Sequence, residues 1–132
     1  MRLDAPFGNS TVGGTAAEAG NIIANNSLAG VEVNTAVGNA IEGNSIYSNG
    51  QLGIDLGNNG VTANDVGDGD TGPNNLQNFP VLAIVSSSAT ETIVQGNLAS
   101  ASNATFLLEF FANQTGDPTG FGKGRRSWIA AS

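Results

Sequence analysis

Three aspartates near the middle of the chain have the residue type and spacing that could bind a metal ion. Asp65, Asp68 and Asp70 lie within the stretch NDVGDGDTGPNN, and Asp55 precedes them by one short loop. Ca²⁺ takes about six to eight hard oxygen ligands from carboxylates, carbonyls and amides, which this stretch supplies in abundance. The spacing differs from an EF-hand loop, and Asx residues alternating with Gly also form ordinary solvated turns. The sequence therefore predicts either a Ca²⁺ site that staples this loop or a solvated acidic turn.

Side chains for nucleophilic or general acid–base catalysis are scarce. The chain has no His and no Cys, so none of its Ser and Thr hydroxyls has an imidazole to activate it. Arg2 and Lys123 enclose a long stretch without any Lys or Arg. We therefore predict that the chain is not an enzyme and needs no cofactor, with Ca²⁺ as the one ion to test.

Composition and charge narrow the classes of partner and fold. The 132 residues carry a net charge of −7, whereas nucleic acids and anionic membranes attract clustered Lys and Arg. No apolar run approaches the ~20 residues that span a bilayer, and the N-terminal MRLDAPFGNS has no signal-peptide pattern. The 19 Gly and 17 Asn favour frequent turns over helices. We expect an all-β protein that neither binds nucleic acid nor inserts into a membrane.

A repeat links two stretches that read like loops, GNIIANNSLAGVEV at 20–33 and GNSIYSNGQLGIDL at 43–56. A shift of 23 residues places similar residues opposite one another, as in Gly20 with Gly43, Asn21 with Asn44, Ile23 with Ile46, Asn26 with Asn49, and Glu32 with Asp55. A fixed period of this length is typical of a solenoid whose coils stack. Stacked coils would place Asn over Asn in amide ladders, Ile and Val inward, and the two acids outward on a solvated face.

These stretches, together with NAIEG and NDVGDGDTGPNNLQNFPVL, resemble right-handed parallel β-helix repeats of large bacterial surface and secreted proteins in the pectate-lyase-like superfamily. The resemblance covers roughly residues 8–82. It implies a short right-handed parallel β-helix of about two to three coils in residues 1–79. It also implies a bacterial secreted or cell-surface location, although no export signal is visible.

The resemblance does not extend to the superfamily's catalytic residues. Its lyases use a basic residue as proton acceptor, and none stands between Arg2 and Lys123. Its hydrolases use aspartates on neighbouring coils; here the matching outward pair is Glu32 and Asp55. We interpret that pair as a solvated face, because any repeat with an acidic outward position produces it.

Residues 80–132 contain longer apolar segments separated by polar turns, and they resemble the first strands of an immunoglobulin-like sandwich. VLAIVSSS (81–88), ETIVQGNLA (91–99) and TFLLEFFAN (105–113) predict strands of a small antiparallel sheet, with a further strand around SWIAA. Three or four strands are too few to close a sandwich of about seven. Either this sheet covers the open coil end or two chains pair their sheets, and we favour a homodimer. The predicted interface is Phe106, Leu108, Phe110 and Phe111.

The sequence thus predicts a non-catalytic structural or interaction protein, a β-helix fragment that self-associates through its C-terminal sheet. The alternative is a Ca²⁺-stabilised carbohydrate-binding module of a cell-surface protein. A polysaccharide lyase or hydrolase is the least favoured class.

Overall fold

The structure is a computed structural model that describes residues 1–4, 8–113, 115–117, 120–121, 124 and 126–131. The described part of the chain is all-β, apart from one 3₁₀ turn, η1, at Pro73–Leu76. Within it, no helix has the length and apolar character needed to cross a bilayer. All-β was the predicted class, and it is confirmed.

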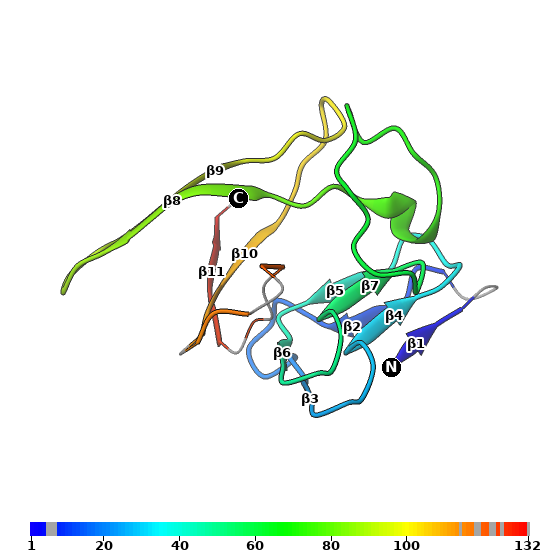
Figure 1. The fold of residues 1–132 in the computed structure, drawn as a ribbon, viewed down its shortest axis with the longest axis horizontal. Coiled ribbons are helices and arrows are strands. Elements are labelled where there is room, and N and C mark those ends of the chain that lie inside the picture. The colour runs from blue at the N-terminus through cyan, green and yellow to red at the C-terminus, as the bar shows by residue number, and fades with distance from the viewer. Residues whose placement is uncertain (5–7, 114, 118–119, 122–123, 125, 132) are drawn as a thin grey trace.

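Three small parallel sheets form the first half of the molecule, which we call the parallel-sheet region (Figure 1). Sheet A consists of β1 (Arg2–Leu3), β4 (Val31–Val33) and β7 (Ile54–Leu56). Sheet B pairs β2 (Thr11–Gly13) with β5 (Ala40–Glu42), and sheet C pairs β3 (Ile22–Ala24) with β6 (Ser45–Tyr47). The chain thus visits sheets A, B and C twice in the same order and then returns to A. Each complete round is called a pass below.

The register of these sheets confirms the 23-residue repeat. Ile23 pairs with Ile46 in sheet C, and Val31, Glu32 and Val33 pair with the residues 23 positions later in sheet A. The first pass is longer, since Thr11 pairs with Ala40 and Arg2 with Glu32. The registers place one extra residue between β1 and β2 and six between β2 and β3, where a corner can lengthen without shifting the strands.

The core of the parallel-sheet region is small and aliphatic. Val31 and Val33 are completely buried, and Ile46 packs with them. Partly buried side chains complete this core: Leu3, Ile23, Ile41 and Leu56. The predicted inward stacks are therefore largely confirmed, although Ile54 stays 40% exposed on β7, the edge strand of sheet A.

Asn side chains join the passes at three corners. The backbone N–H and side-chain amide of Asn21 both donate to Asn44 Oδ1, each at 3.0 Å. Asn26 donates to Asn49 Oδ1 in the same way, at 3.1 and 2.8 Å. A third ladder joins Asn39 to Asn74, and this one was not predicted. The two predicted amide ladders are confirmed.

The expected exposure of the acidic pair is wrong. Glu32 and Asp55 are both buried, because Arg2, Glu32 and Asp55 are consecutive rungs of sheet A and cover one another. The turn after β7 also folds over Asp55, whose carboxylate accepts hydrogen bonds from the backbone N–H groups of Asn59 and Gly60. A position that points away from the core can therefore still be shielded from water.

The C-terminal strands form two separate antiparallel hairpins, not one sheet. One hairpin joins β8 (Val81–Ser87) to β9 (Thr92–Asn97), and the other joins β10 (Leu108–Ala112) to β11 (Arg126–Ala131). All four strands lie where the sequence predicts them. In Figure 1 the β8–β9 hairpin projects to the left, away from the parallel sheets.

The segment around β10 and β11 bonds to the last pass. Gly43 N–H donates to Glu109 Oε1 at 2.8 Å, and Ile46 N–H donates to the Gly124 carbonyl at 2.7 Å. The other side of β6 is paired with β3, so these bonds use its second edge. Of the two arrangements weighed for the C-terminal strands, the intramolecular cover is therefore present in the structure, while the homodimer stays a prediction.

Candidate metal centre

The three predicted aspartates come together in the loop between β7 and η1, here called the acidic loop (residues 64–70). Each of Asp65, Asp68 and Asp70 offers a carboxylate oxygen, and these three atoms lie within 4.8 Å of one another. All three residues are half-buried. Among the described residues no ion pair involves these carboxylates, and Arg2 pairs with Asp4 instead. Three carboxylates this close repel one another unless a cation offsets their charge.

Two of the carboxylate oxygens are shielded from solvent and have no hydrogen-bond donor among the residues that the structure describes. They are Asp65 Oδ1 and Asp70 Oδ1. Buried polar atoms in folded proteins nearly always have a partner, because an unpaired one pays its full desolvation cost. A hard divalent cation is the kind of partner that carboxylate oxygens at this spacing bind. The donor set therefore fits Ca²⁺.

Three of the other four carboxylate oxygens of the cluster accept hydrogen bonds from the protein itself. Asp65 Oδ2 accepts from the Gly69 N–H at 3.0 Å. Asp68 Oδ1 accepts from the Asn78 N–H at 2.8 Å, and Asp68 Oδ2 accepts from the Ser100 hydroxyl. These bonds fix the orientation of two carboxylates before any ion arrives.

Asn78 organises the acidic loop, and sequence reasoning missed it. Its side chain is almost completely buried, accepts from the Asp65 N–H, and donates to the carbonyls of Asp65 and Ala99. Asn64 adds two bonds to the backbone of Phe79. The sequence feature that could have indicated its role is an Asn directly before the apolar residues FPVL, where a buried amide must find partners.

Through Asn78 and Ser100, the acidic loop is tied to the connection between β9 and β10. The ring of Phe79 also meets that of Phe121 edge to face, with centroids 5.7 Å apart. Asp55 does not join the cluster, since its carboxylate is occupied by the turn after β7. An ion bound at the acidic loop would therefore fasten the exit from the parallel-sheet region to the C-terminal hairpins.

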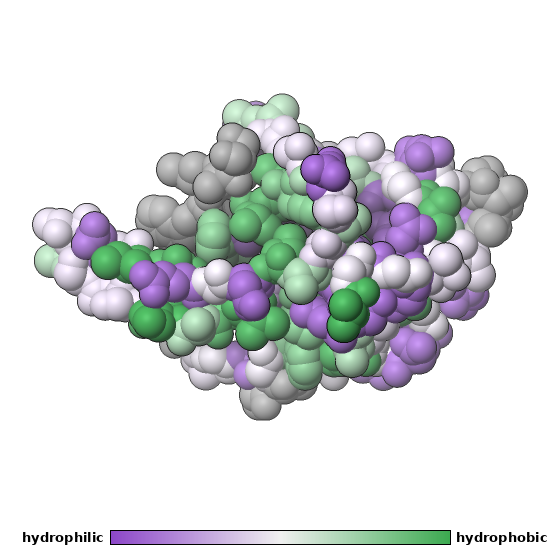
Figure 2. All heavy atoms as spheres, turned by 90° about the horizontal axis from the view of Figure 1, so that it is seen from above, coloured by the Kyte–Doolittle hydropathy of each residue, from purple (hydrophilic) through white to green (hydrophobic). Residues whose placement is uncertain are grey.

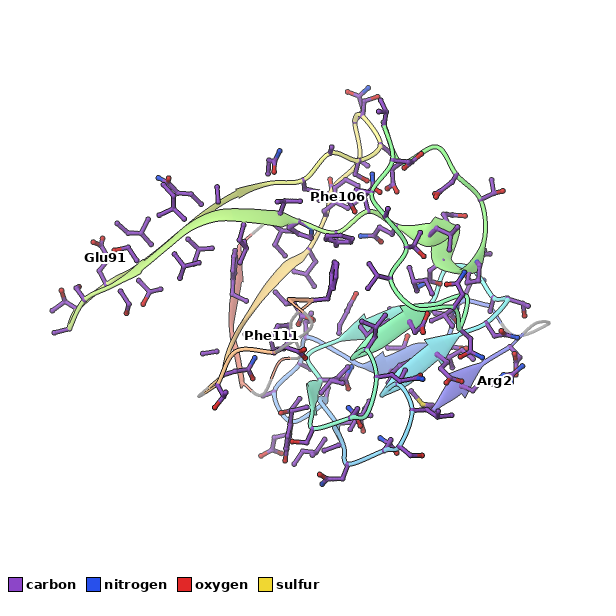
Figure 3. All side chains as sticks on the ribbon, viewed as in Figure 1. Arg2, Glu91, Phe106 and Phe111 are labelled. Carbon is purple, nitrogen blue, oxygen red and sulfur yellow. The ribbon has the colours of Figure 1, made fainter. Side chains whose placement is uncertain are left out.

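The predicted interface residues are less exposed than expected. Phe106, Leu108 and Phe110 are half-buried, and Phe111 is 38% exposed. In Figure 3, Phe111 is labelled at the lower end of the β10–β11 hairpin, next to the parallel sheets, and Phe106 is labelled beside β8. The most exposed run of apolar strand residues lies instead on β8 and β9.

Comparisons of this chain with protein-family models, with curated proteins and with solved structures each found no match.

Proposed function

We propose that this chain is a non-catalytic structural protein, a segment of right-handed parallel β-helix of the kind found in bacterial surface and secreted proteins. Its function is to present a stacked, Asn-laddered surface and to associate with other chains through its C-terminal strands.

The observation that carries this proposal is the register of the passes. The β4–β7 pair of sheet A and the β3–β6 pair of sheet C have the same 23-residue offset, and Asn ladders join the corners at Asn21–Asn44 and Asn26–Asn49. Each pass therefore provides the strand edges and the Asn donors to which the next pass bonds. This is the relation between neighbouring coils in a solenoid.

The placement of the acids supports a non-catalytic role. The pair that could have matched a hydrolase site, Glu32 and Asp55, is buried within sheet A. Two backbone N–H groups occupy the carboxylate of Asp55. A catalytic carboxylate must reach its substrate, and these two are covered by the protein.

Inserting one more pass tests the proposal. A second copy of residues 20–42 is placed between Glu42 and Gly43, so that β3, β4 and β5 are duplicated and the bonds from Gly43 and Ile46 to the C-terminal segment are retained. We expect cooperative thermal unfolding with a Tm within about 5 °C of the parent or higher, because stability in repeat proteins adds by nearest neighbours.

The matched control inserts the same residues in shuffled order at the same point. The shuffled insertion should lower the Tm clearly, since a loop of that length without register adds only entropy. Equal losses of Tm in the two variants would count against equivalent stacked passes.

A second candidate function, a Ca²⁺-stabilised binding module, is supported by the acidic loop. The specific observation is the pair of buried oxygens without donors, on Asp65 and Asp70, within a cluster of three carboxylates. This observation supports the binding of a cation only. A carbohydrate ligand for such a module stays a sequence-based prediction.

Thermal unfolding with Ca²⁺ and with EDTA tests the cation. At about a hundredfold excess of Ca²⁺ over its dissociation constant we expect a rise in Tm of about 10 °C. Asp70→Asn should abolish that rise, yet raise the Tm in EDTA slightly because it removes one of three crowded negative charges. Glu91→Gln, which removes an exposed charge at the tip of the β8–β9 hairpin, should leave both effects intact. A Tm that does not change with Ca²⁺ would contradict a metal site at the acidic loop.

A further inference from the structure

The β8–β9 hairpin exposes apolar side chains on both of its faces. Every residue of β8 is exposed, and so is all of β9 except Val94. The large apolar side chains of the hairpin are between 44% and 61% exposed: Val81, Leu82, Ile84, Val85 and Ile93. A lone two-stranded hairpin is marginally stable in water and gains stability when a further layer covers it.

The hairpin extends away from the rest of the molecule. Figure 3 shows its side chains standing on both sides of the ribbon towards Glu91 at the tip. In Figure 2, hydrophobic residues are interspersed with hydrophilic ones along the arm at the left, the direction in which β8 and β9 project in Figure 1. Nearer its base, the hairpin continues into the connection that is fastened to Asn78.

The accessible surface of the chain is larger than that of a compact monomer. It measures 8557 Å² for a mass of 13.2 kDa. A folded monomer of this mass exposes about 6,400 Å². The excess is about 2,100 Å², whereas each partner in a standard interface buries about 800 Å². The chain thus has enough surplus surface for a stable dimer.

The distribution of charge selects a second copy of this chain as the partner. Residues 71–108 contain a single charged residue, Glu91, although the whole chain carries a net charge of −7. Two copies meeting through the acidic loop would bring like charges together, which is costly across an interface. With Glu91 as its one charge, the hairpin is a surface on which two identical chains can meet with little repulsion.

We propose that the β8–β9 hairpin is the docking site for a second copy of this chain, with the apolar faces of the two hairpins packed together. This inference deepens the proposed structural function, on which it rests, by naming the self-associating element. It moves the interface from residues 105–113, where the sequence analysis placed it, to residues 81–97.

Sedimentation velocity of the full chain at micromolar concentration tests the dimer. The expected mass is twice the 13.2 kDa of one chain. Val85→Lys places a charge on the hairpin and should weaken association by about tenfold or more. Ile22→Lys is the matched control, because Ile22 is an exposed apolar residue on β3 in the parallel-sheet region. It should leave the dimer unchanged.

Circular dichroism confirms that each variant is folded, and Ile84→Lys replaces Val85→Lys if the latter unfolds. A wild-type monomer overturns the inference, and so does a dimer that Val85→Lys and Ile84→Lys leave intact. A dimer lost in Ile22→Lys or in Phe111→Lys alone would place the interface on β3 or β10 and likewise overturn it. The inserted-pass variant tests stability, whereas sedimentation tests mass. A wild-type monomer together with a stable inserted-pass variant would therefore refute the dimer without refuting the stacked passes.

Discussion

Asn44→Ala lowers the free energy of unfolding by about 3 kcal/mol and the Tm by about 10 °C, if the ladder works as the structure indicates. Asn44 is almost completely buried and takes part in four hydrogen bonds. It accepts two from Asn21 and donates to the carbonyls of Val12 and Glu42 at 2.8 and 3.0 Å. Alanine leaves the buried carbonyl of Val12 without its side-chain donor, and the corner loses its link between passes.

Asn59→Ala is the matched control for this substitution. Asn59 is exposed, and the hydrogen bond that holds it uses its backbone N–H. Asn59→Ala should change the free energy of unfolding of the protein by less than about 0.5 kcal/mol. Chemical denaturation measures both variants, and similar losses in the two would contradict a special role for the stacked amides.

Gly20→Ala has the second large expected effect, a loss of about 2–3 kcal/mol from overpacking. A Cβ atom on Gly20 would lie 2.0 Å from the Gly43 carbonyl oxygen in the next pass. That atom belongs to the backbone and cannot rotate away, so the two passes must separate. The adjoining bonds from Asn21 to Asn44 would lengthen with them.

Gly116→Ala is the control, since a Cβ there meets no atom of the described residues within 4 Å. Where the native conformation suits alanine, replacing glycine removes freedom from the unfolded chain and stabilises slightly. The two substitutions should therefore differ in sign as well as size. A neutral Gly20→Ala would mean that the passes are not in close backbone contact at this corner.

The repeat could be found from sequence because stacking demands similar residues at matching corners. Gly20 with Gly43 and Asn21 with Asn44 are kept by close approach and by amide pairing, which few other residues can satisfy. The same shift missed the pairing of β1 with β4 and of β2 with β5, whose offsets are 30 and 29. A longer corner in the first pass changes the count without changing the stacking, so a fixed period does not reveal it.

Burial could not be predicted from the alternation of residues along a strand. Glu32 and Asp55 alternate with core residues as expected, yet neighbouring rungs and the following turn cover them. The role of the Asn78 side chain could not be predicted because its partners, Asp65 and Ala99, are distant in sequence.

The strands with the most exposed apolar side chains are β8 and β9, which the sequence did not single out, for a related reason. The run FLLEFF is the more apolar by sequence, but β11 pairs with β10 and Glu109 reaches back to Gly43. The β8–β9 hairpin forms a two-stranded sheet of its own in the described part of the chain, and its side chains stay exposed. Such a difference depends on tertiary packing, which composition does not encode.

The measurement that most directly tests the stacked passes is amide hydrogen exchange in the wild type and in Asn44→Ala. One N–H from each parallel sheet reports on its own bond between passes: Val31 to Gly53, Ala40 to Ser10, and Ser45 to Asn21. We predict that all three amides open with the same free energy in the wild type and lose protection together in the variant, as one cooperative unit. Independent opening of the three sheets, with a loss confined to Ser45 in Asn44→Ala, would contradict the account.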